Sequence, residues 1–328
     1  MVRFFLLWFL FYSPLLLHSR QSIYSTVVTF KSFVVGRDNR GTGLHRFMQD
    51  TSWAQLGWKT GRTFGVAIHP SKPNFIFLAC GNGVLRSLDR GDSWRITTDW
   101  RVTEVLDLCI DPFDANRIYF ASAYGVWQSR DLGDTWEPAG SGLDHKYVQT
   151  IAADQAQAQR LLVGGETGLY ISENGARNWS KISQVQVPVR DLYQCVASPE
   201  LWLAGTEDQG VLISRDHGKS WQFVRGKIAR ETIYAVTVNP ANPQQMAAGG
   251  YQTGIYLSAD GGKKWKQTRN GLTCLDIHAL AFDLEQSGRI WVGTLGGGMF
   301  YSDDFGKNWI YAGLDGGEIW DMQIIEEK

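Results

Sequence analysis

The chain has 328 residues, which is enough for one large all-β domain or for two ordinary domains. A formal net charge of -1 and a pI near 6.6 exclude a dense basic surface, so nucleic acid is not expected as a main partner. The 36 glycines and 14 tryptophans, without long polar helical stretches, favour many short strands joined by tight turns.

The first element in chain order is an apolar run at residues 4–17, which follows Arg3 and has one short interruption. This pattern is typical of a signal peptide and is short for a membrane-spanning helix. No small-residue cleavage site and no lipobox cysteine follow it. We therefore expect residues 1–26 to be a signal or anchor segment, with an exported or tethered protein. The alternative is a mis-assigned start, with Met48 as the true first residue and a cytoplasmic protein. Residues 27–328 are expected to form a single domain.

One octet, Ser-x-Asp-x-Gly-x-x-Trp, recurs along that domain. Its tryptophans are spaced 42 to 44 residues apart, at Trp94, Trp136, Trp179, Trp221, Trp265 and Trp309. Its aspartates are Asp89, Asp131, Asp216, Asp260 and Asp304, and the third copy has an asparagine instead. A period of this length predicts a four-stranded propeller blade, with the octet in the hairpin between the third and fourth strands. Asp bonds turn amides, Gly takes positive φ and Trp is buried, so we interpret the octets as structural rather than catalytic.

The innermost strand of each blade can be found independently of the octets. Apolar runs of this kind lie at residues 64–68, 105–110, 148–152, 189–196, 233–238, 277–282 and 319–325. Their alternation of large and small side chains suits the tapering centre of a propeller. Seven inner strands accompany only six consecutive blades, which predicts that the two termini share the seventh.

In that shared blade we expect the inner strand at residues 318–325 and two further strands at 32–36 and 43–47. The last strand is expected to start at Trp53, which lies 41 residues before Trp94. The predicted fold is therefore an all-β, seven-bladed propeller of four-stranded antiparallel blades, and joining the termini removes free sheet edges. Six blades with a loose N-terminal segment are the alternative, which a start at Met48 would favour.

The octet resembles the Asp box, or BNR repeat, over residues 60–325. Proteins with this repeat include sialidases, xyloglucanase-type glycosidases, sortilin-type receptors and photosystem II assembly propellers. The Phe/Tyr-Arg-Ile-Pro motif of sialidases is absent, xyloglucanase-type enzymes use two tandem propellers, and sortilin-type propellers have more blades. Photosystem II assembly propellers agree in length and blade number, although only residues 258–265 carry an Asp-Gly-Gly box like theirs.

In a propeller, the loops before the inner strands and those between strands two and three surround one mouth of the central channel. The Asp boxes face the other side, so binding residues are sought on the loops. The candidate rim combines charges of both signs with aromatic side chains, and its residues are Arg37, Asp38, Arg101, His145, Glu166, Glu207, Asp208, Arg230 and Tyr251. Such a mixture suits a sugar or a protein surface.

The leading hypothesis is a non-catalytic binding or assembly propeller that engages a protein or glycan through this rim. The alternative is a glycoside hydrolase, which needs two carboxylates about 5 Å or about 6.5–9.5 Å apart. The available carboxylates are Glu166, Glu207, Asp208, Glu231, Asp107 and Asp321.

The sequence has no zinc-protease, P-loop or dinucleotide motif, and its four cysteines have no metal-site spacing. We therefore expect no cofactor, no metal and a monomer.

Overall fold

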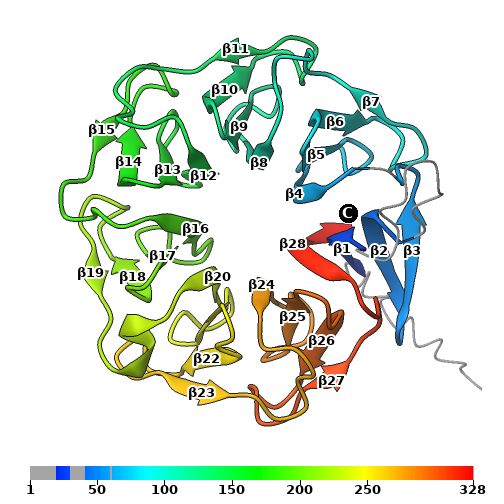
Figure 1. The fold of residues 1–328 in the computed structure, drawn as a ribbon, viewed down its shortest axis with the longest axis vertical. Coiled ribbons are helices and arrows are strands. Elements are labelled where there is room, and N and C mark those ends of the chain that lie inside the picture. The colour runs from blue at the N-terminus through cyan, green and yellow to red at the C-terminus, as the bar shows by residue number, and fades with distance from the viewer. Residues whose placement is uncertain (1–19, 30–40, 60, 328) are drawn as a thin grey trace, which may run out of the picture.

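The computed structural model describes residues 20–29, 41–59 and 61–327. These residues form seven four-stranded antiparallel sheets around a central channel, which confirms the seven-bladed prediction (Figure 1). In each blade the first strand in chain order lies innermost, except in the blade that both termini share. We number the blades 1 to 6 along the chain from residue 63 and call the shared blade 7.

Blades 1 to 3 are built from twelve strands with short connections. Their strands, from the channel outward, are β4 (Thr63–Ile68), β5 (Ile76–Cys80), β6 (Gly83–Ser87) and β7 (Arg95–Ile96); β8 (Val105–Ile110), β9 (Ile118–Ser122), β10 (Gly125–Ser129) and β11 (Glu137–Pro138); β12 (Val148–Ala153), β13 (Leu161–Gly165), β14 (Gly168–Ser172) and β15 (Ser180–Lys181).

Blades 4 to 6 repeat this plan, with one short 3₁₀ helix, η2 (Lys227–Arg230), before blade 5. Their strands are β16 (Val189–Gln194), β17 (Trp202–Thr206), β18 (Val211–Ser214) and β19 (Gln222–Phe223); β20 (Ile233–Val238), β21 (Met246–Gly250), β22 (Ile255–Ser258) and β23 (Lys266–Thr268); β24 (Ile277–Phe282), β25 (Ile290–Thr294), β26 (Met299–Ser302) and β27 (Ile310–Tyr311).

Blade 7 closes the ring with strands from both ends of the chain. Its order from the channel outward is β28 (Glu318–Glu327), β1 (Arg20–Val28), β2 (Gly43–Gln49) and β3 (Ser52–Leu56). Strand β1 pairs antiparallel with β28 at nine positions, from Arg20 opposite Glu327 to Val28 opposite Glu318. Strand β1 thereby joins the two ends of the chain in one blade, which closes the ring.

The N-terminal details differ from the sequence-based expectation. The strand predicted at residues 32–36 lies outside the described residues, and the strand beside β28 is β1. Strand β1 begins within the range 1–26 that was expected to be a signal or anchor segment. Met48 lies in β2, so a chain that started there would lack β1 and most of β2.

The Asp boxes are closed hydrogen-bonded turns. In blade 2, Ser129 Oγ donates to Asp131 Oδ1 at 2.7 Å and accepts from the Gly133 amide at 2.8 Å. The same serine bonds recur in the other five boxes. The box tryptophans of several blades also reach the preceding blade. Trp53 Nε1 donates to the Ala312 carbonyl at 2.7 Å in this way, which joins blade 7 to blade 6.

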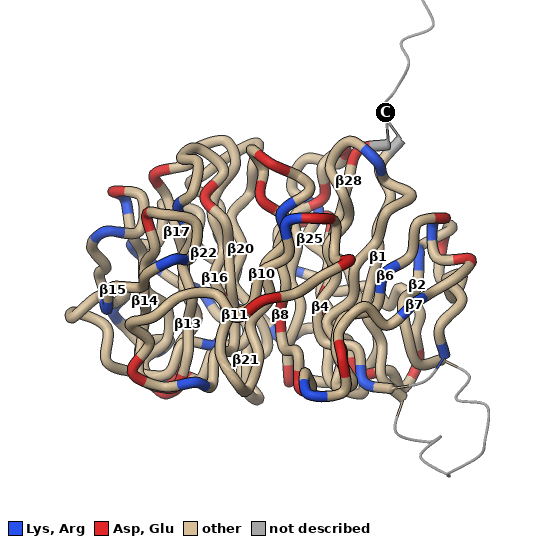
Figure 2. Tube along the Cα trace, turned by 90° about the horizontal axis from the view of Figure 1, so that it is seen from above, with Lys and Arg blue, Asp and Glu red and all other residues tan. Residues whose placement is uncertain are grey.

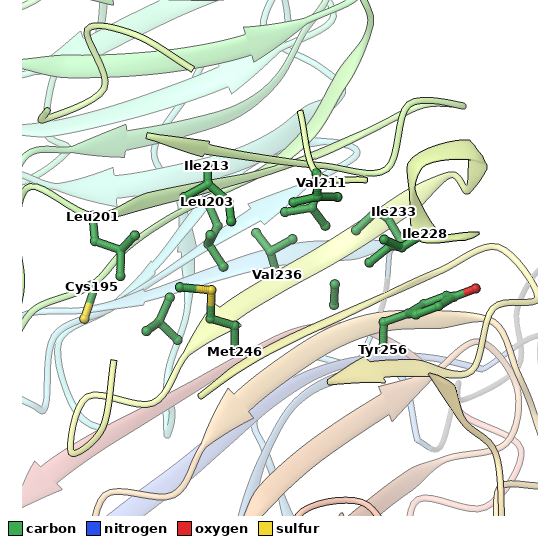
Figure 3. Close-up of a cluster of buried hydrophobic side chains, with 13 residues drawn as sticks. Cys195, Leu201, Leu203, Val211, Ile213, Ile228, Ile233, Val236, Met246 and Tyr256 are labelled. Carbon is green, nitrogen blue, oxygen red and sulfur yellow. The ribbon is translucent and has the colours of Figure 1, made fainter. Parts of the chain in front are cut away.

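The hydrophobic core is divided among the seven interfaces between neighbouring blades. Figure 3 shows one of these clusters, in which Leu203 and Val211 of blade 4 pack against Val236, Met246 and Tyr256 of blade 5. Fully burying a side chain of this size stabilises the fold by about 1.5–3 kcal/mol. Because every blade shares its core with two neighbours, closure through β1 completes the last two clusters.

Candidate binding site at the channel mouth

The loops before the inner strands and the loops between strands two and three lie on one face of the disc. Backbone hydrogen bonds join the two sets, for example from the Glu104 amide to the Gly81 carbonyl at 2.9 Å. A second example runs from the Tyr251 amide to the Thr232 carbonyl at 3.1 Å. These loops surround one mouth of the channel, whose cavity of about 790 Å³ runs along the inner strands, from Arg62 and Glu104 before them to Val196 and Leu284 beyond their far ends. Figure 2 shows acidic and basic residues interspersed over the molecule, so neither sign dominates a whole face.

Each blade contributes to this cavity one side chain from near the start of its inner strand, which is the second residue in blades 1 to 6 and the third in blade 7. In blade order these residues are Phe64, Leu106, Gln149, Arg190, Tyr234, His278 and Trp320. A β-bulge lies at this position in the innermost strand pair of every blade, so that Leu106, for example, is the unpaired residue between Val105 and Asp107. Bulges re-aim side chains, and here they accompany the residues that face the channel.

Half of the mouth is an arc of four aromatic rings from blades 5, 6, 7 and 1. Tyr234 lies 4.5 Å from His278 between ring centroids, His278 lies 4.9 Å from Trp320, and Trp320 lies 5.2 Å from Phe64. All four side chains are partly exposed to the channel. Burial lowers the pKa of His278 to about 4, so its imidazole is neutral at physiological pH and behaves as a further aromatic surface.

The other half of the mouth is polar and centres on Arg190 of blade 4. Its Nη1 donates to Glu166 Oε1 at 3.3 Å and to Gln149 Oε1 at 3.4 Å, and its Nη2 pairs with Glu207. Arg190 thus draws together two of the predicted rim carboxylates, from the β13–β14 and β17–β18 loops. Tyr147 lines the cavity nearby, and burial raises the pKa of its hydroxyl.

Below this ring, three aspartates join neighbouring blades. Asp107 Oδ2 accepts from the Ile151 amide at 2.9 Å, Asp191 Oδ2 from the Val236 amide at 2.7 Å and Asp321 Oδ2 from the Val66 amide at 2.8 Å. The Oδ1 atom of each accepts from the amide of the next residue in its own strand. Burial raises the pKa of Asp107 and of Asp191 to about 7, and it also raises the pKa of Asp321.

These contacts change the interpretation of the carboxylates considered for hydrolysis. Both oxygens of Asp107 and of Asp321 bind backbone amides that would otherwise be left without partners, so their first role is to join blades. Glu231 accepts from the Tyr256 hydroxyl at 2.8 Å. Glu166 and Glu207 remain at the mouth, both in salt bridges with Arg190.

The other predicted rim residues are spread around the face rather than gathered. Arg101 is exposed and pairs with Asp99 at 2.6 Å, and Asp208 Oδ1 accepts from the Thr232 hydroxyl at 2.8 Å. The remaining described members are exposed or partnered by nearby backbone, namely His145, Arg230 and Tyr251. Arg37 and Asp38 lie outside the described residues.

Comparisons with known proteins agree with this architecture. The family described as Sortilin-Vps10 (Sortilin, neurotensin receptor 3) matches residues 209–315. Among solved structures, the GH74 enzyme of Niastella koreensis superposes with a TM-score of 0.68 at 17% identity, covering 90% of this chain and 54% of that one. YCF48 bound to D1 peptide superposes with a TM-score of 0.63 at 13% identity, covering 86% of this chain and 99% of that one. The chain is a seven-bladed β-propeller with Asp-box turns.

Another GH74 enzyme is also similar in fold to this Asp-box propeller. The GH74 xyloglucanase of Xanthomonas campestris gives a TM-score of 0.64 at 19% identity, over 80% of this chain and 46% of that one. The chain therefore spans about half the length of the GH74 structures and nearly the full length of the YCF48 structure. No curated protein matches the sequence.

The described rim residues predicted from the sequence of this Asp-box propeller lie on the connections between strands, whereas the side chains that form the ring at the channel mouth come from inner strands. Arg190, Tyr234, His278 and Trp320 all belong to inner strands and not to loops. The signal that finds them is positional: each lies at the β-bulge near the start of an inner strand, so they recur about once per repeat. Their chemical types differ from blade to blade, so no sequence motif marks them.

The described part of the Asp-box propeller has no cluster of three or more His, Cys, Asp or Glu side chains able to hold a metal ion. Its cysteines Cys80, Cys109, Cys195 and Cys274 are all free thiols. No helix within the described ranges is long and apolar enough to cross a membrane.

Proposed function

We propose that this Asp-box propeller is a non-catalytic binding or assembly protein that engages a protein or glycan through the mouth of its central channel. The observation that carries the proposal is the division of the mouth into an aromatic half and a charged half. The aromatic half is Tyr234, His278, Trp320 and Phe64, and the charged half centres on Arg190. A concave site with apolar walls and a few convergent polar groups is the usual form of a binding pocket.

Aromatic rings and an arginine are the side chains most enriched at the centres of binding interfaces. The arc offers ring faces and edges to an apolar side chain or to the C–H face of a sugar, while Arg190 and its glutamates orient a polar group beside it. Proteins with the same fold include YCF48 bound to a D1 peptide and GH74 enzymes, so both ligand classes are compatible with the architecture.

A glycoside hydrolase is the second candidate, because Glu166 and Glu207 meet at one guanidinium. Hydrolysis needs one carboxyl group that holds a proton for the leaving oxygen. A carboxylate in a salt bridge with arginine is poorly suited to that task, since protonation would break the bridge. This contrast favours binding over hydrolysis.

The binding proposal is tested with the purified full chain on peptide and glycan arrays. Trp320→Ala and Tyr234→Ala are expected to weaken capture of the selected ligands by about thirtyfold, the cost of losing an aromatic anchor of about 2 kcal/mol. Arg101→Ala and Tyr251→Ala on the wider rim, and Glu207→Ala beside Arg190, should weaken it by about two- to fivefold. Lys219→Ala on the Asp-box face is the matched control, and thermal unfolding verifies folding. Unchanged capture by Trp320→Ala would exclude the mouth as the site.

The hydrolysis alternative is tested by incubating the same protein with aryl glycosides, sialosides and β-glucans. Our proposal predicts no turnover. Turnover that Glu166→Gln or Glu207→Gln abolishes, with folding intact, would replace the binding proposal with the enzymatic one.

A further inference from the structure

A second hollow of about 840 Å³ lies at the outer edge of the disc, between blades 5 and 6. One wall is the outermost strand of blade 5, β23, with the residues that follow it. The other wall is the Asp-box turn of blade 6, residues 304–307. In Figure 1 this is the part of the circumference between β23 and β27. We call it the blade 5–6 groove.

The floor of the hollow is apolar, unlike the corresponding position between blades 1 and 2. In blade 1, the residue before the box serine is Arg86, whose guanidinium donates to the Leu132 carbonyl at 2.6 Å and to Asp134 Oδ1 at 2.7 Å in the next blade. In blade 5 the equivalent residue is Leu257, which lines the groove and cannot make those bonds. The space that an arginine fills between blades 1 and 2 thus has an apolar floor between blades 5 and 6, to which Trp265 and Phe305 contribute.

Four cations line the groove, Lys264, Lys266, Arg269 and Lys307. All four are exposed, and the salt bridges found among the described residues include none of them. The pKa of the nearby Asp260 is lowered chiefly by the hydrogen bond from the Lys264 amide, and the charge of Lys264 contributes.

The groove also contains two aspartates, but their box turns already satisfy them. Asp304 Oδ1 accepts from the Lys307 and Asn308 amides at 3.0 Å, and these bonds, with the Asn308 side chain, hold the pKa of Asp304 down to about 2. Asp260 is bound in the same way by the Lys264 amide at 2.9 Å. Both carboxylates remain charged, and their main interactions are with amides rather than with the lysines.

The box geometry does not require the positive charge at this turn. The residue at this turn position is Asp92 in blade 1 and Asp134 in blade 2, whereas the other four boxes have a cation there, namely Arg177, Lys219, Lys263 and Lys307. The blade 5–6 groove differs in that Lys264, Lys266 and Arg269 of blade 5 line it together with Lys307. The fold tolerates either sign at this exposed turn position, so the box geometry does not require the lysines.

We propose that the blade 5–6 groove binds an acidic peptide segment of a partner protein, with an apolar side chain set between its carboxylates. The four cations attract the acidic residues, and the floor at Leu257, Trp265 and Phe305 accepts the apolar one. Strand β23 is the last strand of its sheet, so an extended segment can lie along its free edge. This site is separate from the channel mouth and does not depend on the function proposed there.

The probe for the test is a fluorescein-labelled peptide of alternating Glu and Asp around one Phe, with a Gln/Asn version as its uncharged match. Fluorescence anisotropy with the full chain should detect binding of the acidic peptide only, weakening as salt rises. Lys264→Glu with Lys307→Glu should weaken it at least about tenfold, through lost attraction and added repulsion. Lys219→Glu, in the box of blade 4, is the matched control and should leave binding nearly unchanged.

Leu257→Arg separates groove binding from general attraction to a basic surface. The new guanidinium should fill the floor as Arg86 does in blade 1, so binding should fall about tenfold or more although a positive charge is added. Stronger or equal binding by this variant would overturn the proposal. The proposal would also be overturned if heparin fragments bound tightly and responded to these substitutions while the peptide did not bind. That result would indicate an acidic glycan as the ligand of the groove. Thermal unfolding of each variant verifies that the propeller is intact.

Discussion

Replacing Asp107 and Asp191 with asparagine is expected to remove part of the pH dependence of folding stability. Burial raises the pKa of both carboxyl groups to about 7 in the folded propeller, whereas an aspartate in the unfolded chain has a pKa of about 3.9. The folded protein therefore holds protons that the unfolded chain releases between about pH 4 and pH 7. It follows that these two groups lower the free energy of unfolding as pH rises through that window and have no further effect above it.

The magnitude follows from the size of the shift. A difference of about 3 pKa units corresponds to about 4 kcal/mol per group at 1.36 kcal/mol per unit. Both side chains are partly open to water in the channel, which screens the charge, so we expect about half of that value, or about 2 kcal/mol each. The two asparagine substitutions should thus flatten the profile by about 4 kcal/mol across the window.

The assay is chemical denaturation of the wild-type protein and the double variant at several values between pH 4 and pH 8. Asparagine offers only one acceptor oxygen to the two amides that each aspartate binds, so the variant is less stable at every pH by a nearly constant amount. The test is the difference between the two proteins in the slope of the free energy of unfolding against pH. Asp208→Asn on the exposed rim is the matched control. Parallel profiles for the wild type and the double variant would refute the reasoning.

Three further predictions concern the Asp boxes and the shared blade. Ala176 has φ +61° at the position where the other five boxes have glycine. Ala176→Gly should therefore raise the free energy of unfolding by about 0.5–1 kcal/mol, and a lower melting temperature of the variant would contradict this. Trp53→Ala should lower the free energy of unfolding, measured by thermal unfolding, by about 2–4 kcal/mol, because it removes a partly buried ring and its hydrogen bond to the Ala312 carbonyl. A loss under about 0.5 kcal/mol would exclude a role of Trp53 in joining blades. Deleting residues 1–29 removes β1 and leaves the edge of β28 that it covers exposed, so a protease should cut the variant faster than the wild type. A variant as resistant to the protease as the wild type would disprove that β1 closes the ring.

Much of the fold could be predicted because the propeller is periodic. Each blade needs one buried Trp at the end of its box turn, so the spacing of these tryptophans reports the repeat directly. Trp53 extended the count to a seventh blade although its box has lost the Ser, Asp and Gly. Strand β1 was missed because it follows an apolar run without a clear break, and its partner β28 lies almost 300 residues away.

The site was less predictable, for a different physical reason. Loop position alone placed Glu166 and Glu207 on the rim, but their common partner Arg190 lies inside a strand. Which residue of an inner strand faces the channel depends on the bulge near its start, and a one-residue change of register turns every side chain to the other face. Tyr234, His278 and Trp320 lie in successive blades more than 40 residues apart, and Trp320 meets Phe64 only because the ring closes, so no local pattern records their contacts.

The position of the first array-selected ligand in a co-crystal structure with the full chain tests the central claim most directly. The account predicts that the ligand lies in the channel mouth against Tyr234 and Trp320, with a polar group near Arg190 and its covalent structure intact. A ligand bound only on the Asp-box face, or a cleaved glycoside held between Glu166 and Glu207, would contradict it.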